Sequence, residues 1–216
     1  MNLSDEAIRL WETAKALNLQ AAHVSPAAGR LPPLIFMTDP ERTPRPWEIA
    51  ARLPAGAAVI HRGFGRPEAA DEAARLREIT HKVHVRLLIG LDIDLAVAIG
   101  ADGVHLPERA LDQAPAARAA NLPLVTVAAH SAAALRRAGE AGADAAILSP
   151  VFATRSRSGG DPLGPEGFQR LAKKAEIPVY ALGGVTDSNI ELLSGRRSCG
   201  VCAIDGVVAA FSSGRN

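Results

Sequence analysis

Hydroxyl, guanidinium and glycine residues are concentrated in residues 149–164, whose sequence is SPVFATRSRSGGDPLG. The apolar run 145–148 precedes this segment and is typical of a buried strand. Arginine side chains and the backbone N–H groups of glycine-rich turns both bind oxyanions. The segment therefore predicts a phosphate-binding loop with Arg155 and Arg157 as its cations, and Thr154 and Arg157 are the candidate ligand-binding residues. The alternative interpretation is a basic loop that contacts only solvent.

Glycine follows two later apolar runs. Gly183 and Gly184 come directly after one run, and Gly206 comes shortly after the last one. Because glycine has no side chain, the backbone at these positions can approach a phosphate group closely. We therefore expect the three glycines and the arginine-containing loop to form one phosphate site. Asp205 argues against this, since a carboxylate repels a phosphate dianion unless it points away or pairs with an arginine.

Histidines stand at the ends of other apolar runs. His130 follows the fifth run, and an imidazole titrates near neutral pH and can transfer protons. We take His130 as the candidate catalytic residue. A residue directly before an alanine-rich helix could equally cap that helix or be a partly buried structural histidine. His61 and His105 are weaker candidates, because nothing in their spacing marks a metal or catalytic pair.

Short apolar runs alternate with alanine-rich amphipathic stretches after residue 30. This alternation predicts repeated βα units and a parallel sheet. Eight strands, each followed by a helix, predict an α/β fold of the closed (β/α)8 TIM-barrel type. An open doubly wound sheet that binds a dinucleotide would need a glycine-rich turn after its first strand, and residues 37–40 contain no glycine. The expected strands are 34–37, 57–61, 85–89, 103–106, 124–127, 145–148, 179–182 and 200–204.

The helical candidates lie between these runs, and one precedes them. An amphipathic helix with Ser4 and Asp5 as candidate caps is expected near the N-terminus, followed by a linker over residues 21–30. We therefore divide the chain into residues 1–30, an N-terminal helix and linker, and residues 31–216, the TIM barrel. The apolar face of the first helix would hold Ile8, Leu10, Trp11, Ala14 and Leu17, and could close the barrel bottom or pack on a partner chain. The other expected helices lie near 45–53, 67–82, 92–100, 108–120, 131–141, 165–175 and 186–194, with a short last one from about 206.

The composition is that of an enzyme-sized domain without a strong electrostatic field. The 216 residues are 48% hydrophobic and 22% charged, and the formal net charge is +1. This charge balance argues against nucleic-acid and membrane-surface binding. No run approaches the roughly 20 apolar residues that span a bilayer, and the first six residues lack the basic character of a signal peptide. We expect a cytoplasmic protein.

Cys199 and Cys202 have the spacing of a redox pair or of half a zinc site. They lie in an apolar run that predicts a strand, where positions three apart point to opposite faces. No second cysteine pair completes a metal site. We therefore expect them to be structural.

Two segments carry a family resemblance. Residues 94–106, DLAVAIGADGVHL, are similar to the motif D-L-A-x-x-x-G-A-D-G-V-H-L, and residues 149–154, SPVFAT, are similar to G-P-V-F-x-T. Over residues 34–207 the chain resembles the family of thiamine phosphate synthase and the thiazole tautomerase TenI. The resemblance implies a barrel that holds a phosphate-bearing thiazole in the loops after strands six to eight. It also places Gly183 and Gly184 at the phosphate and puts Arg157 where the family has a lysine.

The chain departs from the family in the half of the site that holds magnesium and pyrophosphate. Leu91 stands where the family has a metal-binding aspartate, although Asp92 is adjacent. The family has a second aspartate in the segment that corresponds to residues 105–110, and this chain lacks it but has Glu108 there. Mg²⁺ prefers carboxylate oxygen ligands, so we predict no metal residue and expect Mg²⁺ only if the coupling activity is retained. Of the family's pyrophosphate-binding Q-x-R-x-K, the chain keeps Arg62 and loses the glutamine and lysine.

Three functions follow from the resemblance. The first is a thiamine phosphate synthase, a transferase that couples a pyrimidine pyrophosphate to thiazole phosphate. The second is a TenI-like thiazole tautomerase in which His130 acts as acid and base. The third is a non-catalytic sensor of a phosphate ligand. In each case the partner is a small phosphorylated thiazole or pyrimidine, and a homodimer would be unsurprising for such a barrel.

Overall fold

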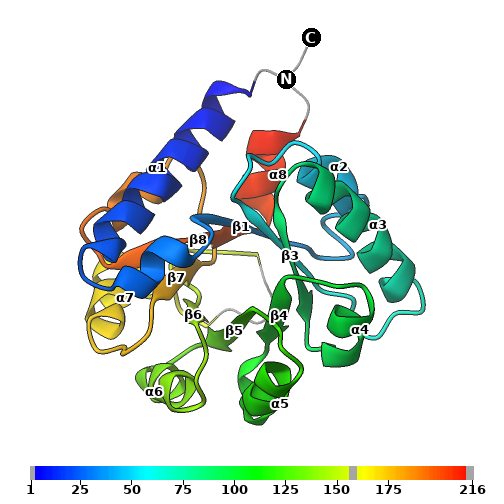
Figure 1. Cartoon of the computed structure of the whole chain (residues 1–216). Coiled ribbons are helices and arrows are strands. Elements are labelled where there is room, and N and C mark those ends of the chain that lie inside the picture. The colour runs from blue at the N-terminus through cyan, green and yellow to red at the C-terminus, as the bar shows by residue number, and fades with distance from the viewer. Residues whose placement is uncertain (1–2, 156–159, 213–216) are drawn as a thin grey trace.

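Eight parallel strands close into a barrel surrounded by helices in the computed structural model, which describes residues 3–155 and 160–212 (Figure 1). Each strand pairs with the next one in the chain, and β8 pairs with β1. The TIM-barrel prediction is confirmed, and several strand ends differ from the expected ones by one or two residues. The strands are β1 (Leu34–Met37), β2 (Ala58–His61), β3 (Arg86–Gly90), β4 (Gly103–Leu106), β5 (Leu124–Ala129), β6 (Ala145–Leu148), β7 (Val179–Leu182) and β8 (Ser198–Ala203).

The helices form the outer layer. Two expected helices differ from the structure: the segment 108–120 divides into the 3₁₀ helix η2 (Glu108–Gln113) and a following α-helix, and the segment 186–194 contains only the 3₁₀ turn η3 (Ile190–Leu193). No helix in the described ranges is long and apolar enough to cross a membrane. The α-helices are α1 (Asp5–Ala22), α2 (Pro46–Ala50), α3 (Ala69–Lys82), α4 (Ile93–Ala98), α5 (Ala114–Ala119), α6 (Ala132–Glu140), α7 (Gly164–Ala172) and α8 (Asp205–Phe211).

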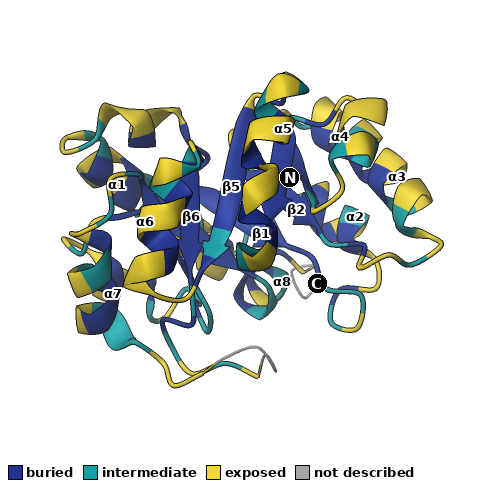
Figure 2. Ribbon diagram, turned by 90° about the horizontal axis from the view of Figure 1, so that it is seen from below, coloured by how far each residue is buried: buried dark blue, intermediate teal, exposed yellow. Residues whose placement is uncertain are grey.

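The core has two parts because both faces of the strands are buried. One set of strand side chains fills the inside of the barrel, among them Ile35, Ile60 and Tyr180. The other set, such as Phe36 and Val59, packs outward against the helices. Figure 2 shows the helices buried on the side that faces the strands and exposed on the other. Burial on both faces explains why these strands appear in the sequence as continuous apolar runs.

The N-terminal helix α1 packs on the chain's own barrel, lengthwise against β8 and beside α8 and η3 (Figure 1). The Ser4 hydroxyl caps it by accepting from the Ala7 N–H at 3.1 Å. Leu10, Ala14 and Leu17 are buried as expected, whereas Ile8, expected on the apolar face, is 46% exposed. Because the segment before β8 forms only the short η3, α1 covers much of the outer side of β8.

Helix α1 is also tied to β8 by a buried amide. The Asn18 side chain donates to the carbonyl oxygens of Cys199 and Ala28, each at 2.8 Å. A further 3₁₀ turn, η1 (Pro26–Arg30), occupies the segment expected to be a linker.

Cys199 and Cys202 lie in the same interior cluster, so the expectation that they point to opposite faces is wrong. The pairing of β8 with β7 shifts by one residue between Ser198 and Val201. Such a bulge adds a residue to one strand and changes the alternation of its side chains. Both thiols are unpaired and buried, and burial raises the pKa of each.

Candidate functional site

A cavity of about 240 Å³ opens at the carboxyl ends of the strands. The last residues of β1, β7 and β8 line it, together with the loops after β1, β2, β6, β7 and β8. In TIM barrels the functional residues lie on this face. Five of the predicted ligand-binding residues line the cavity: Arg62, Thr154, Gly183, Gly184 and Gly206. Arg157 lies outside the described residues.

The loops after β6 and β7 are fastened to each other along one side of the cavity. The Val151 N–H donates to the Leu182 carbonyl and the Phe152 N–H to the Gly183 carbonyl, both at 2.9 Å. Gly184 has a φ of +63°, and a Cβ there would collide with the Ala153 carbonyl oxygen. Glycine is therefore required at 184 for the two loops to meet, and this contact leaves backbone on the cavity wall.

The loop after β7 is held by a residue that the sequence analysis missed. The Asn189 side chain donates to the Gly184 carbonyl at 2.8 Å and accepts from the Thr186 N–H at 2.9 Å. These bonds fix the glycine pair relative to the following turn. An asparagine five residues after a glycine pair is the only sequence signal for this role, and it is weak.

Gly206 lies at the start of α8, where the chain passes close to the loop after β7. A Cβ at this position would collide with the Val185 carbonyl oxygen. The structure therefore gives Gly206 a packing role as well as a place on the cavity wall.

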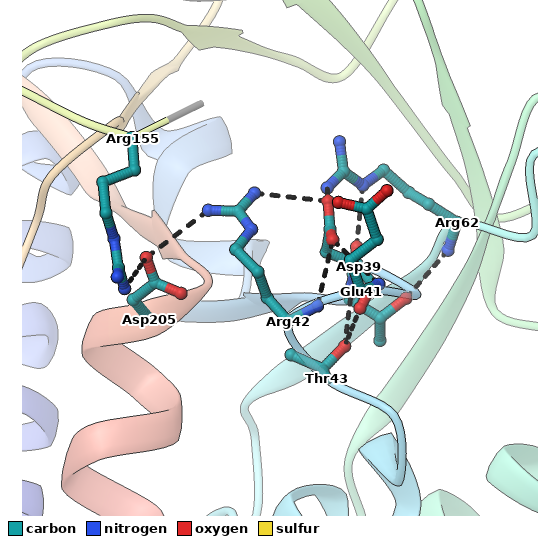
Figure 3. A network of polar contacts seen from close by, with 8 residues as sticks. Asp39, Glu41, Arg42, Thr43, Arg62, Arg155 and Asp205 are labelled. Atoms are coloured by element: carbon teal, nitrogen blue, oxygen red, sulfur yellow. Dashed lines mark hydrogen bonds and ion pairs between the residues drawn. The ribbon is translucent and has the colours of Figure 1, made fainter. Parts of the chain in front are cut away.

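Three arginines and two aspartates from four loops form a network across the cavity mouth (Figure 3). Asp39 Oδ2 accepts from Arg62 at 3.1 Å and from Arg42 at 3.3 Å. Asp205 Oδ2 accepts from Arg42 at 3.4 Å and from Arg155 at 3.3 Å. Arg42 thus joins the two carboxylates. We call these five side chains the arginine–aspartate network.

Asp39 is positioned by a tight turn after β1. Its Oδ1 accepts from the backbone N–H groups of Glu41 and Arg42, each at 3.2 Å, and its own N–H donates to the Thr43 hydroxyl at 2.8 Å. Burial alone would raise the pKa of Asp39, but the hydrogen bond and charge of Arg42, with the charge of Arg62, outweigh burial and lower it. The carboxylate is therefore charged at neutral pH and holds both guanidinium groups.

Arg62 is anchored on its other side as well. Its Nε donates to the Thr38 carbonyl at 2.8 Å, and its guanidinium carbon lies 5.0 Å from the centre of the Phe64 ring. Burial lowers the pKa of Arg62, and Asp39 partly offsets that effect. Phe64 is 66% exposed. The resemblance described above places it where the family has a lysine.

The predicted catalytic residue His130 lies beside the cavity and does not line it. Its Nδ1 is 3.0 Å from the Ser149 carbonyl oxygen and 3.3 Å from the Ser149 hydroxyl, and Ser149 does line the cavity. The cap of α6 is the neighbouring Ser131, whose hydroxyl accepts from the Ala134 N–H at 3.1 Å. A capping role for His130 is therefore wrong, and the exposed imidazole is oriented by Ser149.

The two weaker histidine candidates are buried and structural. His105 Nδ1 is 3.0 Å from the Thr126 hydroxyl, and burial, helped by the charge of Arg62, lowers the pKa of His105 to about 3. His61 Nε2 is 3.2 Å from the Ala69 carbonyl oxygen, and burial lowers the pKa of His61 too.

The carboxylates nearest to the family's magnesium positions do not fit that ion. Asp92 caps α4 by accepting from the Leu95 N–H at 2.8 Å, and Glu108 pairs with Arg137 at 2.6 Å. Within residues 3–155 and 160–212 there is no group of three or more His, Cys, Asp or Glu side chains that could hold a metal ion. Mg²⁺ is usually held by one or two carboxylates together with phosphate oxygens and water, and here both nearby carboxylates are engaged elsewhere, in a helix cap and an ion pair.

Comparisons with known proteins agree with the fold and show the family of the chain. Residues 35–207 match the family model described as thiamine monophosphate synthase. The chain is 36% identical over 132 residues to a putative thiamine-phosphate synthase 2 of Aquifex aeolicus, covering 61% of this chain and 71% of that protein. It is 30% identical over 166 residues to a thiamine-phosphate synthase of Chloroflexus aurantiacus, covering 75% and 77%. A thiamine phosphate pyrophosphorylase from Pyrococcus furiosus shares the fold, with a TM-score of 0.68, 24% identity and coverage of 85% and 93%.

Proposed function

Because this chain belongs to the thiamine monophosphate synthase family, we propose that it acts in thiamine biosynthesis by coupling a pyrimidine pyrophosphate to a thiazole phosphate. In this reaction the thiazole nitrogen forms a bond to the methylene carbon of the pyrimidine. The bond from that carbon to the pyrophosphate oxygen breaks, and pyrophosphate leaves with the electron pair. The observation that carries the proposal is the cavity at the carboxyl ends of the strands, lined by bare backbone and three arginines.

The thiazole phosphate would bind at the loops after β6, β7 and β8. The backbone at Gly183 and Gly184, the hydroxyl of Thr154 and the start of α8 at Gly206 all line this side of the cavity. Backbone N–H groups in such a concave arrangement favour anions. Arg157 remains a predicted phosphate ligand from the sequence.

The pyrophosphate would bind at the opposite side, near Arg62 and Arg42. Both guanidinium groups are already paired with Asp39, so a leaving pyrophosphate has to share them with that carboxylate. Since the carboxylates present do not fit Mg²⁺, the arginines are the groups available here to stabilise the leaving charge. We therefore expect slow coupling with a weakened dependence on Mg²⁺.

The direct test is to incubate the protein with both substrates, with Mg²⁺ or with EDTA, and to measure thiamine phosphate by oxidation to its fluorescent product. We expect product, and an Arg62→Gln variant should lower kcat/KM by about 100-fold, as loss of a charged contact to a leaving group does. Glu166→Gln, which changes a carboxylate outside the cavity, is the matched control. Absence of product, while an authentic synthase works alongside, would overturn the coupling proposal.

A second candidate is thiazole tautomerisation, which needs a proton shuttle and no metal. The observation that favours it is His130, whose Nδ1 lies 3.0 Å from the Ser149 carbonyl oxygen at the edge of the cavity. His130→Ala should then abolish tautomer conversion, followed by the change in the ligand's absorbance, and leave thiazole phosphate binding intact. Unchanged conversion would rule out His130 as the proton shuttle.

If neither reaction occurs but thiazole phosphate raises the Tm, the chain is a phosphate-ligand sensor.

A cytoplasmic location, a homodimer and the absence of nucleic-acid binding belong to the same proposal. The small formal net charge of +1 supports the last of these. Size-exclusion chromatography with light scattering would test the dimer.

A further inference from the structure

Two arginines from loops far apart in the sequence share one carboxylate oxygen at the cavity mouth. Arg42 follows β1 and Arg155 follows β6, and their guanidinium groups lie 3.4 Å and 3.3 Å from Oδ2 of Asp205 (Figure 3). All three residues line the cavity. A carboxylate between two guanidinium groups resembles, in charge and in hydrogen bonding, an anionic group of a bound ligand.

The two aspartates of the arginine–aspartate network differ in how firmly they are held. Asp39 accepts two backbone N–H groups in addition to its arginines, and its side chain is 20% exposed. The Asp205 side chain is 41% exposed, and the Arg155 side chain that it contacts is 84% exposed. Ion pairs between exposed side chains contribute little to stability. Asp39 is therefore part of the scaffold that positions Arg42, whereas a ligand can displace Asp205 at low cost.

The charge of the network also depends on Asp205. Within the network, three guanidinium groups and two carboxylates leave a single net positive charge. Replacing the Asp205 carboxylate by a neutral group would leave two. A phosphate monoester carries up to two negative charges, so the carboxylate both repels it and occupies its partners.

We infer that Arg42 and Arg155 form a binding subsite for the anionic group of the ligand, and that Asp205 occupies this subsite in the free protein as a tethered competitor. Asp205 and Arg42 then determine specificity. The Asp205 carboxylate weakens the binding of phosphate, and a bound phosphate replaces that carboxylate as the partner of the Arg42 guanidinium. The inference rests on the proposed function only in assuming that the cavity binds an anion.

The test measures the Kd of inorganic phosphate by calorimetry in a low-salt buffer without other multivalent anions. Asp205→Asn keeps the shape of the side chain and removes its charge, and it should bind phosphate about tenfold more tightly than the wild type. Asp205→Ser should show a gain of similar size. Adding Arg42→Gln to Asp205→Asn should remove the gain, because the subsite then lacks one of its two cations.

Glu166→Gln is the matched control. It removes the same charge from another arginine pair, with Arg196 at 2.7 Å, on α7 and away from the cavity. An unchanged phosphate affinity in both Asp205 variants would overturn the inference, as would an equal gain in Glu166→Gln. Thermal melting confirms that each variant is folded.

The outcomes separate this inference from the proposed function. Tighter phosphate binding by Asp205→Asn, without thiamine phosphate formation by the wild type, would support the subsite and contradict the coupling reaction. Thiamine phosphate formation by the wild type, with unchanged phosphate affinity in both Asp205 variants, would support the reaction and contradict the subsite.

Discussion

At the scale of single residues, burial and charge give similar side chains different roles. Asp39 and Asp205 both bind arginines at the cavity mouth, but only Asp39 also accepts backbone N–H groups. Three histidines follow the same logic. His105 and His61 are buried and have lowered pKa values, whereas His130 is exposed beside the cavity. A residue's type alone therefore does not assign it to the site.

His105 should make the stability of the protein depend on pH. Its pKa is about 3 in the folded state, and burial is the main cause. In the unfolded chain the value is near the ordinary 6.5, so between these pH values the unfolded state binds the extra proton. The stability that His105 contributes is therefore complete above about pH 6.5 and falls by up to about 1.4 kcal/mol per pH unit below it.

Urea unfolding at pH 7, 6 and 5 tests this dependence. His105→Gln keeps a polar group for Thr126 and removes the titration, so its free energy of unfolding should fall less steeply between pH 6.5 and 5 than that of the wild type. Parallel slopes for the two proteins would show that His105 is not protonated differently in the folded and unfolded states.

At the scale of elements, apolar runs predicted the strands well and the helices less well. Strands buried on both faces need apolar side chains throughout, so β1 to β8 were visible in the sequence. The expected helix at 186–194 is only the turn η3, and α1, from the start of the chain, packs on the outside of β8 instead. That replacement depends on contacts between distant segments, which local periodicity does not record.

The packing of α1 predicts unequal effects for two leucines on the same helix. Leu10 is fully buried against the barrel, whereas Leu19 is 65% exposed. Leu10→Ala should lower the free energy of unfolding by about 2–4 kcal/mol through lost burial and a cavity. Leu19→Ala, the control with the same chemical change, should alter it by less than about 0.5 kcal/mol. Equal losses in urea unfolding would contradict this position of α1.

At the scale of the whole molecule, barrel closure assembles the cavity from segments spread over the chain. The rule that functional residues follow the strands predicted Arg62, Thr154 and the three glycines on its wall. Arg42 was missed because it lies beyond a turn after β1 and meets Asp205 across 163 residues of sequence. Asn189 was missed for a similar reason, since its bonds depend on how the loop after β7 folds back. Sequence alone predicts strand ends, and three-dimensional closure decides which side chains meet there.

The packing of α1 on the closed barrel predicts the result of a truncation. Helix α1 buries Ala7, Leu10, Ala14 and Leu17 in the same core cluster as the outward-facing strand residues, and Asn18 bonds the backbone of β8. A domain has a net stability of only about 5–15 kcal/mol, so we expect the loss of these buried contacts to unfold the barrel. A chain that begins at residue 31 should therefore lose cooperative thermal unfolding and bind a dye specific for exposed apolar surface. Cooperative unfolding of the truncated chain would instead show that residues 31–216 fold as an independent unit.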